Sequence, residues 1–357
     1  MANRNSRISQ MAPTLLLCAS MALLSACGEE AEAGPEPISA IGSSTVYPFA
    51  VKVAENYVAA NEGAAMPSID STGTGEGIQT FCAGQGPGTP DILNASRRMT
   101  AEELGTCAAN GVAEVIEIKV GRDGLVFVSS QDEGIEFNLT PTIVYRALAA
   151  MPYGREQTAV NWSDVDGSLP DEPILVYGPP ASSGTRDALL DVVMMKACDA
   201  NGAMSALRDS DPEAYELNCH ALRSDQAYLS QGEQDDLVAR KVASNPRAIG
   251  IFGYSYLEES ADTIKGLPMN GIAPSAETIA DETYPGSRGL YIYVKKAHIG
   301  VTPGLEDYLA QWSQDWSSGG SLTGIGLVPM TQERQEASSA AISQQTVLTA
   351  EDLAPEA

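Results

Sequence analysis

The sequence predicts an α/β protein. Strand-like apolar segments alternate with helix-like segments along the chain, and turns rich in Gly, Ser and Thr join them. The chain has 357 residues, of which 43% are hydrophobic, so it can bury a core large enough for two lobes. In layered α/β proteins ligands bind where strands end and helices begin, so binding residues are expected in these turns.

Residues 1–26 are expected to be an export signal. Arg4 and Arg7 precede the apolar stretch "MAPTLLLCASMALL", and the next residues, "LSAC", resemble the lipobox of bacterial lipoproteins. In those proteins the signal is cleaved before the cysteine, which then carries a lipid. We therefore expect Cys27 to be lipidated and residues 27–37 to form a tether, so that the protein is held at a membrane face in the periplasm or on the cell surface. An ordinary secretory signal with an incidental cysteine is the alternative.

The first folded unit is predicted to be a strand followed by a helix. "EPISAIG" is strand-like, and "YPFAVKVAENYVAAN" follows with Phe49, Val53, Tyr57 and Val58 on one helical face. Pro48 suits the first turn of that helix, because its missing N–H would have no helical partner there.

The same alternation continues through the rest of the chain. Thr100 and Glu103 have the spacing of a capping box at the start of one helix. The segment after about residue 331 is polar and is expected to be a mobile tail or a loosely held helix. The further strand-like segments are "MPSIDSTG", "PDILNASR", "GLVFVSS", "PILVYG", "AIGIFGYSYLEE" and "GLYIYVK", and the further helix-like ones are "GEGIQTFCAG" and "TRDALLDVVMMKAC".

The cysteines outside the signal and the lipobox are expected to form disulfides, because an exported protein folds in an oxidising compartment. They form no C-x-x-C pair and have no histidines at zinc spacing, so no metal and no cofactor are expected. Four cysteines allow three pairings, and proximity in the sequence favours Cys82–Cys107 and Cys198–Cys219.

The charge of the chain excludes one class of partner. It has 21 basic and 47 acidic residues, a formal charge of −26, so nucleic acid is not an expected partner. The chain also has no G-x-S-x-G, no G-x-x-x-x-G-K-[ST] and no H-E-x-x-H, and it is not expected to be an enzyme.

Three turns share one design that suits an oxyanion. They are "GSSTVYPF" at 42–49, "STGTGEGIQTFC" at 71–82 and "PPASSGTRDALL" at 179–190. Each places hydroxyls and a flexible glycine backbone before a helix, whose first N–H groups are unpaired and partly positive. A fourth segment, "NASRR" at 94–98, adds a guanidinium. The sequence therefore predicts one oxyanion held by neutral donors and a single arginine.

The order of the motifs resembles that of the phosphate-binding proteins of Pst-type ABC transporters over about residues 38–330. The motifs are "GSSTVYPF", "GTGEGIQTFCAG", "DILNASRRM", "SSGTRDA", "NPRAIGIFGYSY" and "YPGSRGLYIYV".

The resemblance implies a two-lobed α/β fold of the periplasmic-binding-protein type II class, with a central cleft and hinge crossings near residues 118 and 250. Lobe I would comprise residues 38–118 and 250–330, lobe II residues 119–249, and the tail residues 331–357. The protein would be a monomer that binds inorganic phosphate and delivers it to permease and ATPase subunits. A binding protein for another tetrahedral oxyanion (sulfate, molybdate or arsenate) is the alternative.

The resemblance also implies which residues hold the ligand. The matching positions are Thr45 and Val46, the latter through its backbone N–H, then Thr74, and then the Ser183–Thr185 turn, which contains Gly184. The candidate set adds the hydroxyl of Ser44, from the first turn, and that of Ser96, from the fourth segment.

The sequence departs from the best-studied branch of that family in its charged groups. Arg97 occupies the position of an aspartate that accepts the proton of protonated phosphate, and Pro179 occupies the position of an arginine. The charged donor is therefore expected to be Arg97. Our hypothesis for the proton acceptor is Glu76, which would select hydrogen phosphate over sulfate; a solvated helix-start residue is equally compatible. Arg186 is expected either to touch the ligand or to pair with Asp187 or a distant carboxylate.

Overall fold

The computed structural model describes residues 37–181, 183–231 and 235–353. The predicted signal, the predicted lipid-bearing Cys27 and nearly all of the predicted tether lie outside these residues. Among the helices of the described residues, none has the length and apolar character needed to cross a bilayer.

Within the described residues, nine strands form one mixed sheet in the order β2-β1-β3-β9-β4-β7-β5-β6, and β8 pairs with β4. Pairing is parallel around β1 and around β5, and antiparallel wherever β4 or β9 takes part. The strands are β1 (Ser39–Gly42), β2 (Ser68–Ser71), β3 (Ile92–Ala95), β4 (Val115–Ser130), β5 (Val176–Gly178), β6 (Tyr228–Ser230), β7 (Ile249–Gly253), β8 (Ile264–Gly266) and β9 (Ser287–Lys295).

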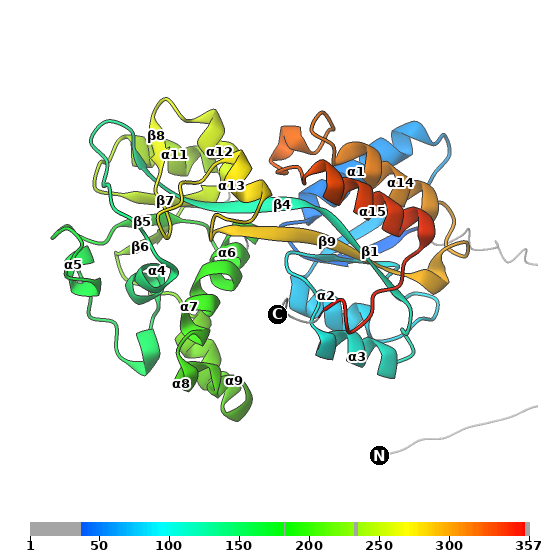
Figure 1. The fold of residues 1–357 in the computed structure, drawn as a ribbon, viewed down its shortest axis with the longest axis horizontal. Coiled ribbons are helices and arrows are strands. Elements are labelled where there is room, and N and C mark those ends of the chain that lie inside the picture. The colour runs from blue at the N-terminus through cyan, green and yellow to red at the C-terminus, as the bar shows by residue number, and fades with distance from the viewer. Residues whose placement is uncertain (1–36, 182, 232–234, 354–357) are drawn as a thin grey trace, which may run out of the picture. The chain divides into compact units, whose positions relative to one another are not determined.

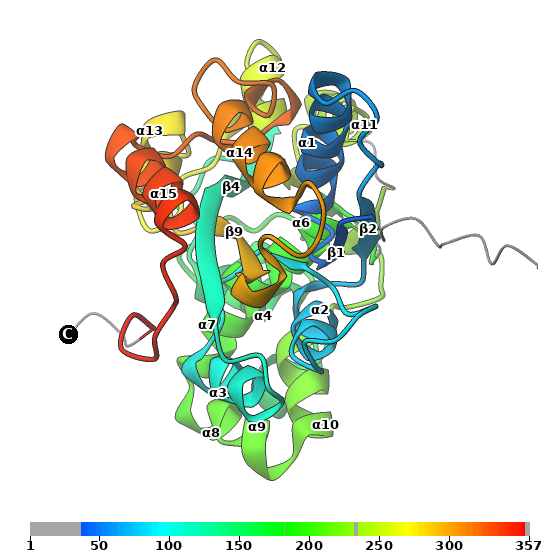
Figure 2. The same cartoon turned by 90° about the vertical axis from the view of Figure 1, so that its right-hand side faces the viewer.

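Helices cover both parts of the sheet (Figures 1 and 2). The α-helices are α1 (Tyr47–Ala60), α2 (Thr74–Phe81), α3 (Ala101–Ala109), α4 (Pro141–Leu148), α5 (Trp162–Val165), α6 (Gly184–Ala188), α7 (Met195–Asp199), α8 (Gly202–Ser205), α9 (Leu207–Ser210), α10 (Pro212–Tyr215), α11 (Asp235–Ala243), α12 (Tyr254–Glu259), α13 (Ala276–Ala280), α14 (Leu305–Asp315) and α15 (Gln332–Gln344). The 3₁₀ segments are η1 (Pro152–Gly154), η4 (Lys296–His298) and η5 (Thr323–Ile325), and the π-helical ones are η2 (Leu189–Met194) and η3 (Glu216–His220).

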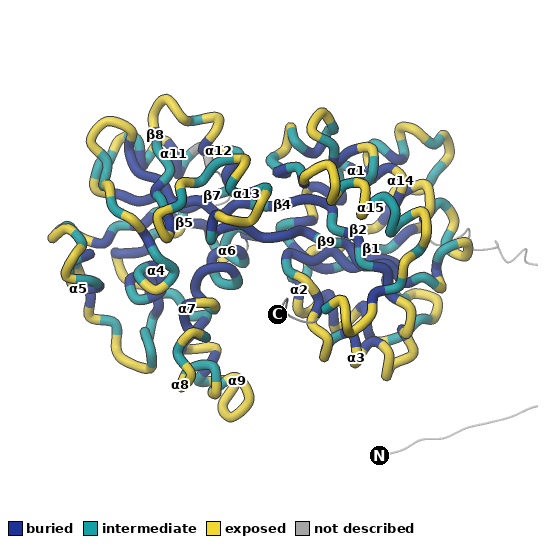
Figure 3. The backbone as a smooth tube through the Cα atoms, viewed as in Figure 1, coloured by how far each residue is buried: buried dark blue, intermediate teal, exposed yellow. Residues whose placement is uncertain are grey.

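The two long strands β4 and β9 connect the two lobes. They pair from Val115 opposite Lys295 to Gly124 opposite Ser287, with an irregularity between Lys119 and Gly121. Figure 3 shows both strands buried along most of their length. On β4, Ile116 and Ile118 before the irregularity belong to the core of the first lobe, whereas Leu125 to Val128 after it belong to the core of the second. Strand β4 and its partner β9 are therefore the crossings of the two-lobed fold.

The core of the first lobe surrounds β1, β3 and the first half of β4. As the sequence predicts, α1 buries Phe49, Val53 and Tyr57, and Pro48 stands in its first turn. Trp312 of α14 is fully buried in the same cluster, and α14 packs beside α1. A smaller cluster lies under α2 and α3 and contains Phe81.

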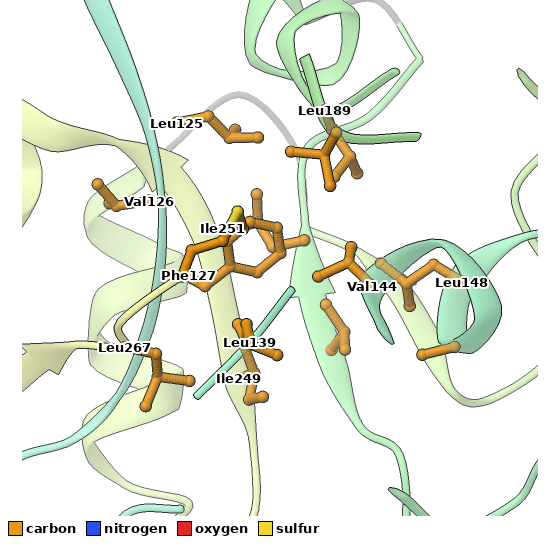
Figure 4. Close-up of a cluster of buried hydrophobic side chains, with 14 of the residues drawn as sticks. Leu125, Val126, Phe127, Leu139, Val144, Leu148, Leu189, Ile249, Ile251 and Leu267 are labelled. Carbon is orange, nitrogen blue, oxygen red and sulfur yellow. The ribbon is translucent and has the colours of Figure 1, made fainter. Parts of the chain in front are cut away.

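The core of the second lobe surrounds the second half of β4 (Figure 4). It unites Leu125 and Phe127 of β4 with Val144 of α4, and it also contains Ile251 and Leu267. The boundary expected near residue 250 therefore falls inside this cluster, and the chain returns to the first lobe along β9. The predicted strand "AIGIFGYSYLEE" is a strand only as far as Gly253, because α12 begins at Tyr254.

Two disulfides close short loops. The structure pairs Cys82 with Cys107 and Cys198 with Cys219, which are the pairings that proximity in the sequence favours. The first bridge joins the end of α2 to α3, and the second joins α7 to η3.

Within the segment after residue 331, Gln332–Gln344 form the helix α15, which is docked on β4. The Ser338 hydroxyl of α15 donates to the Lys119 carbonyl at 2.8 Å, and the Leu348 N–H donates to the Val115 carbonyl at 2.8 Å. Of the two expectations for this segment, the helix is therefore the one observed, and it packs on β4.

Candidate functional site

The turns after β1, β2 and β3 meet at one edge of the sheet, because the three strands run parallel. The Gly42 carbonyl accepts from the N–H groups of Thr72 and Gly73, each at 2.9 Å. The Ser43 N–H donates to the Asn94 carbonyl at 2.9 Å. The predicted anion turns of the first lobe are therefore bonded to one another.

Gly42 is required by this close approach. Its φ is +129°, and a Cβ on it would lie 2.2 Å from the Asn94 carbonyl oxygen. A Cβ on Gly77, in α2, would lie 2.5 Å from the Gly42 Cα. Glycine at both positions lets the start of α2 rest directly on the end of β1.

Within the first lobe the candidate donors form two small groups. The N–H groups of Thr45 and Val46 donate to the Ser43 hydroxyl at 3.2 and 3.4 Å. The Thr74 hydroxyl accepts from the Ser96 N–H at 3.1 Å, and the two hydroxyls lie 3.0 Å apart. Thr74, Ser96 and Val46 are buried.

The third predicted turn comes from the second lobe and touches the first. Ser183 caps α6, and its hydroxyl accepts from the Thr185 N–H at 3.2 Å. The Thr45 hydroxyl donates to the Gly184 carbonyl at 3.0 Å, and the Ser44 hydroxyl donates to an Asp187 carboxylate oxygen at 2.7 Å. The structure therefore brings the first and third predicted turns into direct contact across the cleft.

Gly184 is packed on the first lobe. A Cβ on it would lie 2.5 Å from Thr45 Oγ1 and 2.7 Å from the Thr45 nitrogen. The helix that starts there runs on through the π-helical segment η2 into α7. The contact between the lobes thus depends on the absence of a side chain at this position.

Arg288, on β9, is the charged group at this contact. Its Nη2 donates to the Thr45 hydroxyl at 2.6 Å and to the Gly184 carbonyl at 3.0 Å. Its Nε donates to Asp123 at 3.0 Å, and Arg288 is 6% exposed. Its Nη1 is buried and has no hydrogen-bond partner within the described part of the chain.

The structure places Arg97 differently from the sequence-based expectation. Its guanidinium donates to both carboxylate oxygens of Glu103, at 2.7 and 3.0 Å, and this hydrogen bonding raises the pKa of Arg97. Glu103 also completes the predicted capping box with Thr100. The positive group that reaches Thr45 is therefore Arg288 and not Arg97. Arg288 lies in the motif "YPGSRGLYIYV", in which no ligand-binding residue is predicted from the sequence.

A cavity of about 500 Å³, which we call the cleft cavity, adjoins this contact. Its lining includes Ser96, Arg97, Asp191, Tyr284, Ser287 and Arg288. Burial, together with the nearby charge of Asp187, raises the pKa of Asp191, while Arg288 and Arg97 act in the opposite sense. Asp191 is thus a partly buried carboxyl that shares a cavity with Arg288.

Two residues left open by the sequence lie outside this contact. Glu76 is exposed in the first turn of α2, and it has no hydrogen bond or ion pair with any described residue. The Arg186 guanidinium lies 5.0 Å from the centre of the Tyr228 ring, as a cation–π pair. Within the described residues, Arg186 therefore pairs with an aromatic ring and forms no ion pair with Asp187 or another carboxylate.

Comparisons with known proteins agree with this architecture. A family model described as a PBP superfamily domain matches residues 28–314. Protein SphX of Synechococcus elongatus is 31% identical over 284 residues, which cover 76% of this chain and 73% of that protein. A phosphate-binding protein PstS of Staphylococcus saprophyticus is 27% identical over 296 residues, covering 80% of each chain.

A solved structure supports the fold. The crystal structure of a possible phosphate binding protein from Planctomyces limnophilus aligns with a TM-score of 0.69 at 25% identity, covering 87% of this chain and 98% of that one. The predicted two-lobed α/β fold and the predicted resemblance are confirmed. The chain belongs to the PBP superfamily.

Proposed function

We propose that this chain binds inorganic phosphate outside the cytoplasm and delivers it to an ABC permease. Relatives named as phosphate-binding proteins support the choice of ligand over sulfate, molybdate and arsenate. The observation that carries the proposal is Arg288. A buried guanidinium contacts Thr45 of one lobe and Gly184 of the other, and it still has a buried Nη1 without a partner among the described residues.

The arrangement suits an oxyanion for physical reasons. The starts of α1, α2 and α6 supply backbone N–H groups and hydroxyls, and N–H groups at helix starts favour negative charge. Arg288 adds donors whose bonds to an anion are charge-assisted. In our proposal phosphate takes up the donors of Thr45, Val46 and the Ser183–Thr185 turn, with Thr74, Ser96 and Ser44 beside it, and the lobes close over it.

Selectivity against sulfate requires an acceptor for the proton of hydrogen phosphate. Glu76, our sequence-based hypothesis, is exposed. Asp191 lines the cleft cavity with Arg288 and Ser96. We therefore propose Asp191 as the carboxylate that accepts this proton; fully ionised sulfate has no proton to offer it.

The remaining parts of the proposal concern how the receptor works in the cell. The chain acts as a monomeric receptor and catalyses no reaction, so its permease and ATPase partners supply the energy for uptake. A lipid on Cys27 holds it at the membrane face. Mass spectrometry of the mature protein tests this anchor, since a chain that begins at Cys27 without added lipid mass would exclude it.

Calorimetric titration of the mature chain with phosphate and with sulfate tests the function. We expect one tight phosphate equivalent, with a Kd of about 1 μM or lower, which corresponds to about −8 kcal/mol. Sulfate is expected to give no tight equivalent. The protein should first be unfolded and refolded to remove any bound anion. If the refolded protein then gives no heat of tight phosphate binding, the proposal is refuted. If sulfate binds as tightly as phosphate, the general oxyanion alternative is favoured.

A further inference from the structure

A second cavity, of about 310 Å³, lies next to the cleft cavity, and we call it the outer cavity. Both cavities are lined by Arg98, Glu282 and Tyr291, so these residues form a wall between the two cavities. The outer cavity adds Lys119 from β4 and Arg334 from α15, the helix docked on β4.

The cationic side chains around the outer cavity outnumber the carboxylates that pair with them. One oxygen of Glu282 lies 2.8 Å from Lys119 Nζ, and the same oxygen forms the ion pair of Arg122. Glu282 is itself about half exposed, because 46% of its side chain is accessible. Arg334 has no ion pair or hydrogen bond with any described residue.

Burial makes this crowding costly. Arg122 is 4% exposed, and its Nε has no hydrogen-bond partner among the described residues. Burial, together with the like charges of Arg122 and Arg334, lowers the pKa of Lys119 to about 7. Arg98 is paired with Glu117 at 2.6 Å and adds a further positive charge whose carboxylate is already engaged. Such a group of cations is stabilised by an anion.

We propose that the outer cavity is a second, weaker oxyanion site, where Lys119, Arg334 and Arg98 hold a phosphate dianion next to the cleft. The identity of the anion as phosphate rests on the proposed function, whereas the site itself rests on the charges. The formal charge of the chain is −26, so an approaching anion is repelled by the protein as a whole. A local group of cations beside the cleft cavity counters this repulsion and raises the anion concentration near Arg288.

The site differs from the cleft in how it recognises an anion. It offers charge without a carboxylate poised to accept a proton, because Glu117 and Glu282 are engaged by arginine and lysine. Sulfate is therefore expected to bind it as well as phosphate does. Binding is also expected to weaken between about 0.02 M and about 0.3 M salt, since the cavity is open to screening.

The test is equilibrium dialysis of the full mature chain with labelled phosphate and, separately, labelled sulfate, up to about 10 mM at low salt. We expect two phosphate equivalents, one tight and one weak, and one weak sulfate equivalent. Arg334→Gln and Lys119→Gln should each weaken the second phosphate equivalent at least about tenfold and change the tight one by less than about twofold. Arg247→Gln, which removes a mostly exposed arginine paired with Glu172, is the matched control and should leave both unchanged.

The outcomes separate this inference from the proposed function. A single phosphate equivalent over the whole range, or a weak equivalent that survives both Arg334→Gln and Lys119→Gln, overturns the second site. If the parent chain shows no tight phosphate equivalent but binds sulfate weakly in a way that depends on Arg334, the proposed function is refuted and the second site is supported. Thermal melting of each variant separates loss of binding from loss of folding.

Discussion

Arg288→Gln is expected to weaken phosphate binding by about 10²- to 10⁴-fold. The buried Nη1 of Arg288 carries two N–H donors and has no partner among the described residues. A hydrogen bond to a charged group contributes about 1.5–3 kcal/mol, so the loss of two amounts to about 3–6 kcal/mol. Each 1.4 kcal/mol corresponds to about tenfold in Kd, which gives the stated range.

The same substitution leaves Asp123 without its arginine, because Arg288 Nε donates to that carboxylate at 3.0 Å. Stability should therefore fall by about 1–3 kcal/mol, which thermal melting measures alongside the titration. Arg288→Lys keeps the charge but not the planar fork, so it should bind more tightly than Arg288→Gln and still about tenfold or more below the parent.

Arg97→Gln is the matched comparison, since Arg97 is bonded to Glu103. It should change the calorimetric Kd by less than about threefold. If folded Arg288→Gln binds phosphate within about threefold of the parent, or if Arg97→Gln causes the larger loss, the assignment of the charged donor to Arg288 is wrong.

Three further predictions concern the contact between the lobes, selectivity and pH. Gly184→Ala places a Cβ 2.5 Å from Thr45 Oγ1, whereas nothing lies within 4 Å of a Cβ on Gly75. Gly184→Ala should therefore weaken phosphate binding by about 1–3 kcal/mol, and the control Gly75→Ala should not. Calorimetry measures both, and equal Kd values for the two variants would contradict this prediction. Asp191→Asn should admit sulfate in the same titration while Glu76→Gln should not, and the reverse result would restore the sequence-based hypothesis. Lys295 is fully buried, and burial lowers its pKa to about 8, so between pH 8 and about 10 the unfolded chain keeps a proton that the folded chain loses. The free energy of unfolding of the parent should therefore rise with pH, relative to that of Lys295→Met, by up to about 1.4 kcal/mol per pH unit. Denaturation curves that give the two proteins the same pH dependence would refute this.

Local sequence predicts the anion turns well because their chemistry is local. Ser183 caps α6, and the Ser43 hydroxyl accepts from the N–H groups of Thr45 and Val46 at the start of α1. The capping box of Thr100 and Glu103 is equally local and is present as predicted. Patterns of a few residues are sufficient for such features, since the partners are close in the chain.

Arg288 could not be assigned in the same way. Its partners Thr45 and Gly184 are 243 and 104 residues away, and its own segment has the pattern of a buried strand. The available signal was an arginine within an apolar strand, which requires a buried partner. Arg97 stands beside a predicted turn, and the short-range pattern did not show that Glu103, six residues further on, binds its guanidinium.

The lobe boundary depends on strand pairing rather than on composition. β7 and β9 both have the pattern of late buried strands, but β7 pairs with β5 in the second lobe, whereas β9 pairs with β3 in the first. Nothing within either strand distinguishes these partners. The expected crossing near residue 250 was therefore one strand too early in the chain.

The pairing of Asp123 with Arg288 in the β4–β9 ladder has a mechanical consequence. Two hydrogen-bonded strands resist sliding past each other but bend readily, so the two lobes are joined by a hinge that bends mainly in one direction. Arg288 lies on one of the two hinge strands, β9, close to the irregularity between Lys119 and Gly121. An anion that pulls on the Arg288 guanidinium would act directly on this hinge, so binding of the anion and closure of the lobes would occur together.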